Sequence, residues 1–171
     1  GYVYPETYFF DPESNIDEIT NTLVTKSTNK LTNLINPVGL NTDQAKIILI
    51  KASLVEAEGR TKDERHMIAG IIENRLAINM PLQLDATLTY LTGKGSSQLT
   101  LKDLKNPSPY NTYVNKGIPP APINNPGEES INAILKPKDS SFLYYLHDKN
   151  GTIHYAKTYQ EHLQNKNKYL R

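Results

Sequence analysis

Two apolar helical segments separated by a short connection constrain the fold of this chain most. Thr42 is a good N-cap residue, and the first segment is predicted to run from it to Glu58, because Gly59 follows directly and ends the helix. The second segment carries apolar residues at spacings of three and four and stops near Pro81. Since only a few residues join the two helices, we expect them to pack against each other.

Shorter elements are predicted around this pair. Ser14 or Asn15 caps a first helix that extends to about Leu34, and Pro37 breaks the chain after it. The other predicted helices are a turn at Leu101–Leu104 capped by Thr100, a helix at Ser130–Leu135, and a C-terminal helix capped by Thr158. The predicted extended segments are residues 1–10, residues 82–85 and 87–90, and a hairpin made by residues 142–146 and 152–156. A helical core with a small antiparallel sheet is an α+β domain.

Residues 106–127 hold more than half of the chain's eleven prolines and show almost no periodicity. This composition predicts a long loop without regular structure. Loops of that length inside a compact domain are usually functional. We therefore expect this segment to form part of a binding surface.

Charge and composition exclude several classes of function. The 19 basic residues nearly cancel the 18 acidic ones, leaving a net charge of +1, so no strong field gathers nucleic acid or anionic lipid. The absence of cysteine excludes disulfides and thiolate metal sites. The four histidines lack the spacing of metal ligands, so neither a metal nor another cofactor is expected. The longest apolar run, Ile47–Ile50, is far shorter than the roughly 20 residues that span a bilayer, and we expect the chain itself to be soluble.

Glu58 is the first candidate for a catalytic group. On a helix it continues the apolar side that holds Ile50 and Leu54. A carboxyl group in such surroundings favours its neutral form, which suits a general acid acting on a glycosidic oxygen. Gly59 would leave room beside it for a bulky substrate. The alternative is a glutamate in the last helical turn that simply points into water.

Glu56 lies two residues earlier and therefore points to the opposite side of the same helix. The two glutamates cannot form the facing pair of carboxylates that ordinary glycosidases place across the scissile bond. We expect a structural role for Glu56. Any glycosidic chemistry would then rest on an acid that has no carboxylate partner on its own helix.

The segment Ala52–Glu58 resembles the Ala-Ser-aliphatic-aliphatic-Glu-x-Glu signature of the endolytic murein transglycosylase family, also called the YceG-like family. Further segments resemble the motifs of that family in the same order and spacing. These are Ile72–Leu76, Met80–Thr87, Pro109–Tyr113, Gly117–Ile123 and Asn125–Gly127. The resemblance covers nearly the whole chain, and the ordered set is far more specific than a single Glu-x-Glu.

The resemblance implies a lyase that cuts the β-1,4 bond between N-acetylmuramic acid and N-acetylglucosamine within a glycan strand. The product is a 1,6-anhydromuramoyl end, because the C6 hydroxyl of the sugar itself attacks the anomeric carbon. Glu58 aligns with the essential glutamate of the family, as the general acid and then the general base. Two other classes stay open: a noncatalytic peptidoglycan-binding or scaffolding module, and a lysozyme-like muramidase.

Polar and aromatic residues of the matched motifs are the candidates for substrate binding, since they suit hydrogen bonds to acetamido groups and stacking on sugar faces. The alternative for each is a role in shaping its loop. Asp85 is also the one other carboxylate with a possible catalytic effect. The candidates are Asn74, Gln83, Asp85, Thr87, Tyr110, Asn111, Thr112, Tyr113 and Asn125.

The resemblance also implies a setting. Residues 1–171 correspond to the catalytic domain of the family, whose members usually carry an N-terminal membrane helix and a LysM-like domain that this chain lacks. Its expected partners are peptidoglycan glycan strands and peptidoglycan synthases, and no nucleic acid. The expected location is the extracytoplasmic, periplasmic face of the bacterial inner membrane, with the full-length protein anchored there.

Overall fold

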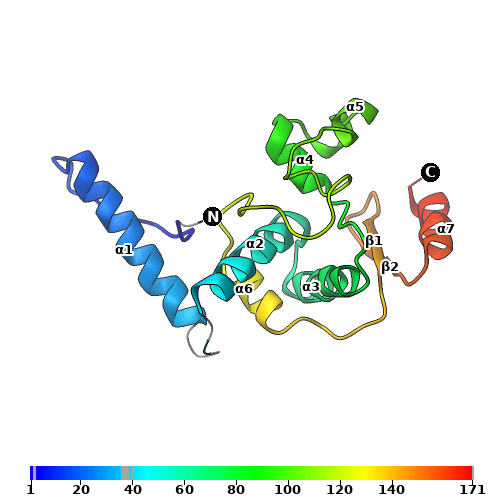
Figure 1. Ribbon diagram of the computed structural model, residues 1–171, viewed down its shortest axis with the longest axis horizontal. Helices are drawn as coiled ribbons and strands as arrows, with labels where there is room; N and C mark the ends of the chain where they lie inside the picture. The colour runs from blue at the N-terminus through cyan, green and yellow to red at the C-terminus, as the bar shows by residue number, and fades with distance from the viewer. Residues whose placement is uncertain (2, 36–38, 40, 171) are drawn as a thin grey trace.

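The structure is a computed structural model that describes residues 1, 3–35, 39 and 41–170. Helices alternate with irregular segments, and two strands pair as one small antiparallel sheet, which confirms the predicted α+β class. Figure 1 labels the elements. In chain order they are α1 (Ile16–Ile35), α2 (Thr42–Glu58), α3 (Lys62–Ala77), α4 (Asp85–Thr92), the 3-10 turn η2 (Ser96–Gln98), α5 (Leu101–Leu104), α6 (Glu128–Leu135), β1 (Tyr144–His147), β2 (Ile153–Ala156) and α7 (Tyr159–Tyr169).

The core lies between α2, α3 and α6 (Figure 1). Helices α2 and α3 contact each other, as their sequence predicts, and α6 packs on both. Leu54, Ile68 and Ile131, one from each helix, are fully buried. These three helices form the central core of the domain.

The capping residues of most helices agree with the sequence prediction. Asn15 accepts from the backbone N–H groups of Asp17 and Glu18, and Thr100 and Thr158 cap their helices as expected. For α2 the prediction is wrong by one residue, because the N-cap is Asn41 rather than Thr42. The Asn41 side chain accepts from the Gln44 N–H at 2.9 Å and the Gln44 side chain accepts in return, a capping box. Pro37 lies outside the described residues.

The prediction for residues 82–85 and 87–90 as extended pieces is wrong from Asp85 onward, since this stretch is helix α4. The β-branched threonines that suggested a strand tolerate the helix because their hydroxyls donate to carbonyls three residues back. Thr87 donates to Leu84 and Thr89 to Ala86, each at 2.8 Å. Full burial of Leu88 and Thr87 against the domain then outweighs weak helix propensity.

Residues 106–127 form the expected long segment without helix or strand. It leaves the upper part of the molecule in Figure 1, where α4 and α5 lie, and returns across α2 to α6. Ser53 of α2 anchors it, accepting from the Ile123 N–H at 3.0 Å, while Asn124 donates its side-chain amide to the Ser53 carbonyl at 2.9 Å. Buried polar contacts thus hold the loop in one place.

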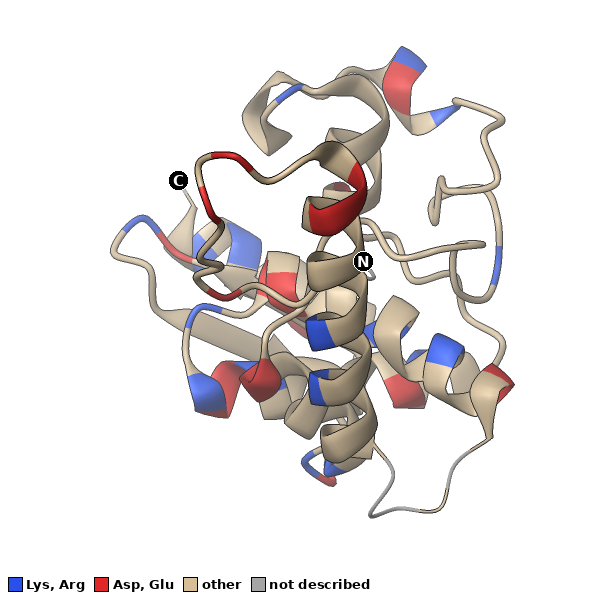
Figure 2. Cartoon of the chain, turned by 90° about the vertical axis from the view of Figure 1, so that its left-hand side faces the viewer, with Lys and Arg blue, Asp and Glu red and all other residues tan. Residues whose placement is uncertain are grey.

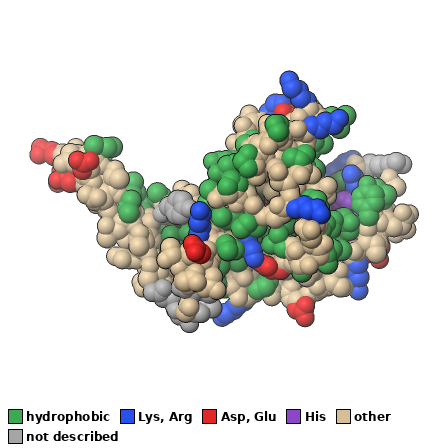
Figure 3. Space-filling model, in the orientation of Figure 1, with side chains coloured by type: hydrophobic (Ala, Val, Ile, Leu, Met, Phe, Trp, Pro, Cys, Tyr) green, Lys and Arg blue, Asp and Glu red, His purple; other side chains and the backbone are tan. Residues whose placement is uncertain are grey.

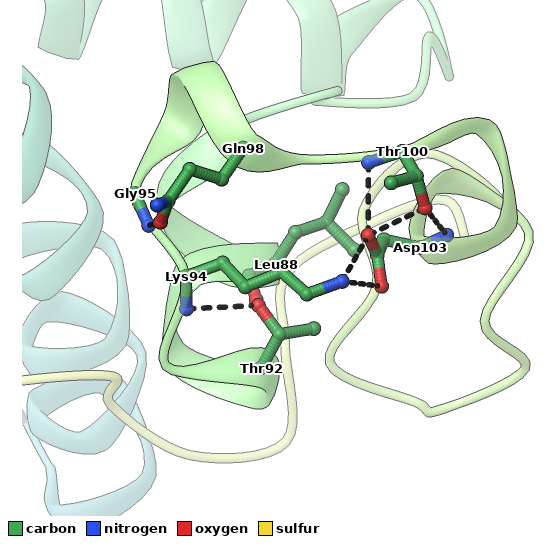
Figure 4. Close-up of polar contacts among 7 residues, drawn as sticks. All are labelled: Leu88, Thr92, Lys94, Gly95, Gln98, Thr100 and Asp103. Atoms are coloured by element: carbon green, nitrogen blue, oxygen red, sulfur yellow. Dashed lines mark hydrogen bonds and ion pairs between the residues drawn. The ribbon is translucent and has the colours of Figure 1, made fainter.

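An ion pair ties α5 to the turn that follows α4 (Figure 4). Lys94 donates to Asp103 at 2.7 Å, and the same carboxylate accepts from the backbone N–H of Thr100. Lys94 and Thr100 together hold the pKa of the Asp103 carboxyl below its usual range. The ion pair thus connects the segment Gly93–Gln98 to α5.

Helix α1 extends away from the core (Figure 1). Its first turn and the loop before it are acidic, and basic residues follow further along the helix, as the colours of Figure 2 show. Figure 3 shows the same acidic side chains gathered at the free end. Of residues 1–10, which we expected to pack on the domain, Tyr4 is buried in the core, but Phe9 and Phe10 are exposed.

The hairpin and the C-terminal helix form a second layer beside the core (Figure 1). Tyr145 of β1 lies opposite Tyr155 of β2, and α7 packs against both strands. The predicted hairpin is confirmed. Within the described ranges, no helix combines the length and the apolar character needed to cross a membrane.

A glycine in α3 provides a test of the packing around the core. A Cβ added at Gly70 would lie 2.2 Å from the Lys138 carbonyl oxygen, a contact that rigid backbone cannot relieve. Gly70→Ala should therefore lower the free energy of unfolding by about 1–3 kcal/mol, although alanine is the better helix former. Denaturant unfolding measures this change.

Gly95→Ala is the matched control, since a Cβ there meets only the Gln98 side-chain oxygen at 3.7 Å and the backbone has an ordinary negative φ. This variant should change stability by less than about 0.5 kcal/mol. Equal stability of the two variants would contradict the packing described for Gly70.

Candidate active site

A cavity of about 590 Å³ opens where the C-terminal end of α2 meets α3, α4, β1 and α7. Its volume is in the range of ligand-binding clefts. Charged, polar and aromatic side chains of elements far apart in the sequence line it together. They include Glu58, Arg75, Gln83, Asp85, Tyr113, Tyr144, Tyr145, Tyr159, His162 and Lys166.

Glu58 is the last residue of α2, and its half-buried side chain lines this cavity. The Tyr145 hydroxyl donates to Oε2 at 2.8 Å, and the Ala86 N–H donates to Oε1 at 3.4 Å. Burial raises the pKa of Glu58, and the two hydrogen bonds oppose that rise without cancelling it. Ile50 and Leu54 on the same side of the helix are buried, whereas the groups that surround Glu58 include the polar side chains of Tyr145 and Asp85.

The expectation that Gly59 leaves room for a substrate beside Glu58 is wrong. Gly59 does not line the cavity, and a Cβ on it would lie 2.6 Å from Cγ and 3.1 Å from Cα of Arg65. Its backbone is extended rather than left-handed. The missing side chain therefore makes room for the first turns of α3 and not for a substrate.

Glu56 points away from the cavity, as its spacing predicts. Its Oε2 accepts from the Gly127 N–H at 3.0 Å and from the Ser130 hydroxyl at 2.7 Å, and Arg65 lies 3.4 Å from Oε1. The carboxylate thus satisfies free donors at the N-terminal end of α6. The structure gives Glu56 the structural role expected for it.

Asp85 brings a second carboxyl group into the cavity. It lies in the first turn of α4, and its Oδ1 accepts from the Tyr113 hydroxyl at 2.5 Å. Burial and the hydrogen bond to Asp85 raise the pKa of Tyr113 far above its ordinary value. The charge of Asp85 also adds to the rise in the pKa of Glu58 that burial causes. Tyr113 is the point at which the proline-rich loop reaches the site.

Gln83, Asp85 and Tyr113 are the predicted binding residues that the fold brings together at the cavity. Gln83 has a positive φ of 48°, and its N–H donates to the Thr112 carbonyl at 3.0 Å, which fixes the turn into α4. The fold does not bring the other predicted binding residues to the cavity lining. These are Asn74, Thr87, Tyr110, Asn111, Thr112 and Asn125.

Most of these six residues make contacts that shape loops. Asn74 donates to the carbonyls of residues 140 and 142, and the buried Asn111 donates to those of residues 104 and 106. The hydroxyls of Thr87 and Thr112 lie 3.1 Å apart in the interior. Tyr110 packs its ring on Tyr90, and Asn125 is exposed away from the cavity.

Sequence reasoning missed two residues next to Glu58. Tyr145 carried only the alternating pattern of a strand, and nothing local shows that its hydroxyl reaches a carboxyl 87 residues away. Arg75 is buried and donates from Nε to the Leu143 carbonyl at 2.6 Å and from Nη1 to the Leu82 carbonyl. Its place inside the matched segment Ile72–Leu76 was the only available signal.

Metal ligation is not part of this geometry. Across the part of the chain that the structure describes, no three His, Asp or Glu side chains are grouped so that they would hold a metal ion. The chemistry of the cavity is that of carboxyl, hydroxyl and cationic groups.

Comparison with known proteins places this arrangement in a family. The model of the YceG-like family matches residues 1–168. A Bacillus subtilis protein named endolytic murein transglycosylase is 38% identical over 171 residues, 99% of this chain and 48% of its own length. A Streptococcus pneumoniae protein of the same name is 30% identical and is matched over 96% of this chain and 31% of its own length.

A crystal structure of a yceG-like protein from Listeria monocytogenes superimposes with a TM-score of 0.81 at 37% identity, over 96% of this chain and 53% of that one. The chain thus spans half or less of the length of the curated relatives that it matches. Sequence, fold and the order of the motifs agree, and the chain belongs to the YceG-like family.

Proposed function

We propose that this chain is the catalytic part of an endolytic lytic transglycosylase that cuts the bond between N-acetylmuramic acid and N-acetylglucosamine within glycan strands. The observation that carries the proposal is the half-buried carboxyl of Glu58, with its raised pKa, in the lining of a cavity of about 590 Å³. The names of the relatives supply the substrate class, murein. A carboxyl group with a raised pKa beside a large polar cleft suits protonation of a glycosidic oxygen.

In the proposed reaction, protonated Glu58 donates its proton to the glycosidic oxygen as the bond from that oxygen to the anomeric carbon breaks. The C6 hydroxyl of the muramic residue attacks the same carbon and gives its proton to the Glu58 carboxylate, which restores the acid. Water is neither consumed nor released. Tyr145 is a positioning residue, since its hydroxyl holds Oε2, while Oε1 accepts only the longer hydrogen bond from the Ala86 N–H.

The proposal includes a setting for the reaction. The chain acts on peptidoglycan strands at the extracytoplasmic face of the cytoplasmic membrane, near the synthases that make them. The longer protein is held there by an N-terminal membrane helix and carries a LysM-like domain. The relatives support this only in that their chains are longer than the matched part.

A second candidate is a muramidase, which one observation favours. Asp85 faces the same cavity as Glu58, so two carboxyl groups are available, as in glycosidases that activate water. In that reaction Asp85 would take the proton of an attacking water, and the product would be a reducing muramic end. The two products differ in mass by one water.

Glu58→Gln tests the general acid. The amide keeps the shape of the side chain but has no acidic proton. The rate at which new glycan-strand ends form in purified sacculi should therefore fall roughly 10²- to 10⁴-fold. Mass spectrometry of the released products measures the rate and identifies the ends as anhydro or reducing. If the variant forms product at the wild-type rate, Glu58 is not the acid.

Glu56→Gln is the matched control, because it makes the same chemical change two residues away. It weakens the contacts to Gly127 and Ser130, so thermal stability should drop while the product yield per folded molecule is kept. If the wild-type protein itself releases nothing from sacculi or nascent strands, a noncatalytic binding module becomes the better account.

Tyr145→Phe tests the link between hydrogen bonding and proton affinity. The Tyr145 hydroxyl lowers the pKa of Glu58 against the larger effect of burial, so its removal should raise that pKa further. The acid must be protonated, and activity is lost as pH rises through this pKa. The alkaline limb of the pH–rate profile should therefore move to higher pH, with a lower maximal rate.

Tyr144→Phe serves as the comparison, since Tyr144 lines the cavity but is not among the groups that set the pKa of Glu58. Its alkaline limb should coincide with that of the wild type. An unshifted limb in Tyr145→Phe would reduce Tyr145 to a packing residue.

Asp85→Asn separates the two candidate reactions. A transglycosylase needs no base other than Glu58, so the variant should keep the anhydro product and lose only about ten-fold in rate, through the disturbed contact with Tyr113. A muramidase would lose the base that activates water, and reducing ends would disappear. Mass spectrometry with the rate measured at several pH values decides between these results.

A further inference from the structure

The cavity extends from Glu58 to a wall of different chemistry, which we call the α7 wall. It consists of Arg75, Tyr144, Tyr159, His162 and Lys166. The rings of Tyr144 and His162 stack with centroids 5.4 Å apart, and the Arg75 guanidinium lies 5.3 Å from the Tyr144 ring centroid. The acidic groups Glu58 and Asp85 line the same cavity. The cavity therefore holds both acidic and cationic side chains.

The charges of Arg75 and Lys166 both act on His162. Burial lowers the pKa of His162, and the charges of Lys166 and Arg75 lower it further. The imidazole therefore favours its neutral form. Both cations are close enough to repel a proton on this ring.

Hydrogen-bonding capacity on the α7 wall is left unused. Arg75 donates from Nε and Nη1 to backbone carbonyls, and among the described residues its Nη2 has no protein acceptor. Among the residues that the structure describes, no carboxylate lies within ion-pair distance of Lys166. The buried Nδ1 atom of His162 has no hydrogen-bond partner among them either. Positive charge and free donors that converge on a cavity suit an anionic group with several acceptor atoms.

We propose that the α7 wall is a carboxylate-binding subsite that reads the acidic branch of muramic acid. This inference rests on the proposed function, because it assumes a glycan substrate. N-acetylglucosamine carries no carboxylate, whereas the lactyl branch of muramic acid ends either in a free carboxylate or in a stem peptide that bears carboxylates. Binding of that branch at Arg75 and Lys166 sets the register of the strand, so that a muramic residue lies beside Glu58.

Binding probes without turnover test the subsite directly. The Glu58→Gln protein is titrated with N-acetylmuramic acid, which has a free lactyl carboxylate, with the peptide-bearing disaccharide, and with chitobiose, which has no carboxylate. A bound carboxylate offsets the charges of Arg75 and Lys166, so the pKa of His162 should rise with either acidic probe and stay unchanged with chitobiose. NMR of the histidine ring signals measures this pKa, and the two acidic probes distinguish lactyl from peptide recognition.

Lys166→Gln should weaken binding of an acidic probe about five-fold, the range of an exposed ion pair, and leave chitobiose binding unchanged. Lys166→Arg should keep the affinity. Lys168→Gln is the matched control, since it removes the same charge from the same helix at a residue outside the cavity, and it should bind like the parent.

The inference is wrong if acidic probes and chitobiose bind alike, or if Lys166→Gln and Lys168→Gln weaken binding equally. The proposed function is judged separately. Cleavage of sacculi with no preference for acidic probes would leave the function standing without the subsite. A rise in the pKa of His162 with acidic probes, in a protein that releases no product, would leave the subsite standing without the reaction.

Discussion

The partial burial of one carboxyl group at the end of α2 is the constraint on which the rest of the site depends. A charged carboxylate in such a place is costly, and burial shifts the proton equilibrium of Glu58 toward the neutral acid. Tyr145 and Ala86 donate to the two oxygens and fix their orientation. Helix α2, helix α4 and strand β1 must all be in place for this to hold, which explains why the site requires the whole fold.

The two glutamates of the Glu-x-Glu segment divide the work between chemistry and architecture. Spacing on the helix sends Glu56 toward α6, where its carboxylate holds the Gly127 N–H and the Ser130 hydroxyl, and sends Glu58 toward the cavity. Because α6 packs on both α2 and α3, the structural glutamate fixes the helices that carry the chemical one. A motif of seven residues thus specifies both a packing contact and a reactive group.

Sequence patterns predicted the parts of this fold that local physics decides. Residues close together in the sequence determine the helix caps Thr100 and Thr158, the hairpin and the two central helices. Helix α4 was missed because its threonines favour strands locally, and only burial of Leu88 with hydroxyl back-bonding makes the helix stable. Tyr145, Arg75 and the α7 wall were missed for a related reason, since they meet Glu58 or its cavity only through tertiary packing.

The most direct measurement of the central claim is the titration of the Glu58 side-chain carboxyl by carbon NMR in the folded protein, assigned by comparison with Glu58→Gln. The account predicts a midpoint clearly above that of an ordinary glutamate, with the neutral acid persisting toward neutral pH. A midpoint at or below the ordinary glutamate value would mean that the carboxyl is ionised under working conditions. In that case Glu58 would not serve as the proton donor.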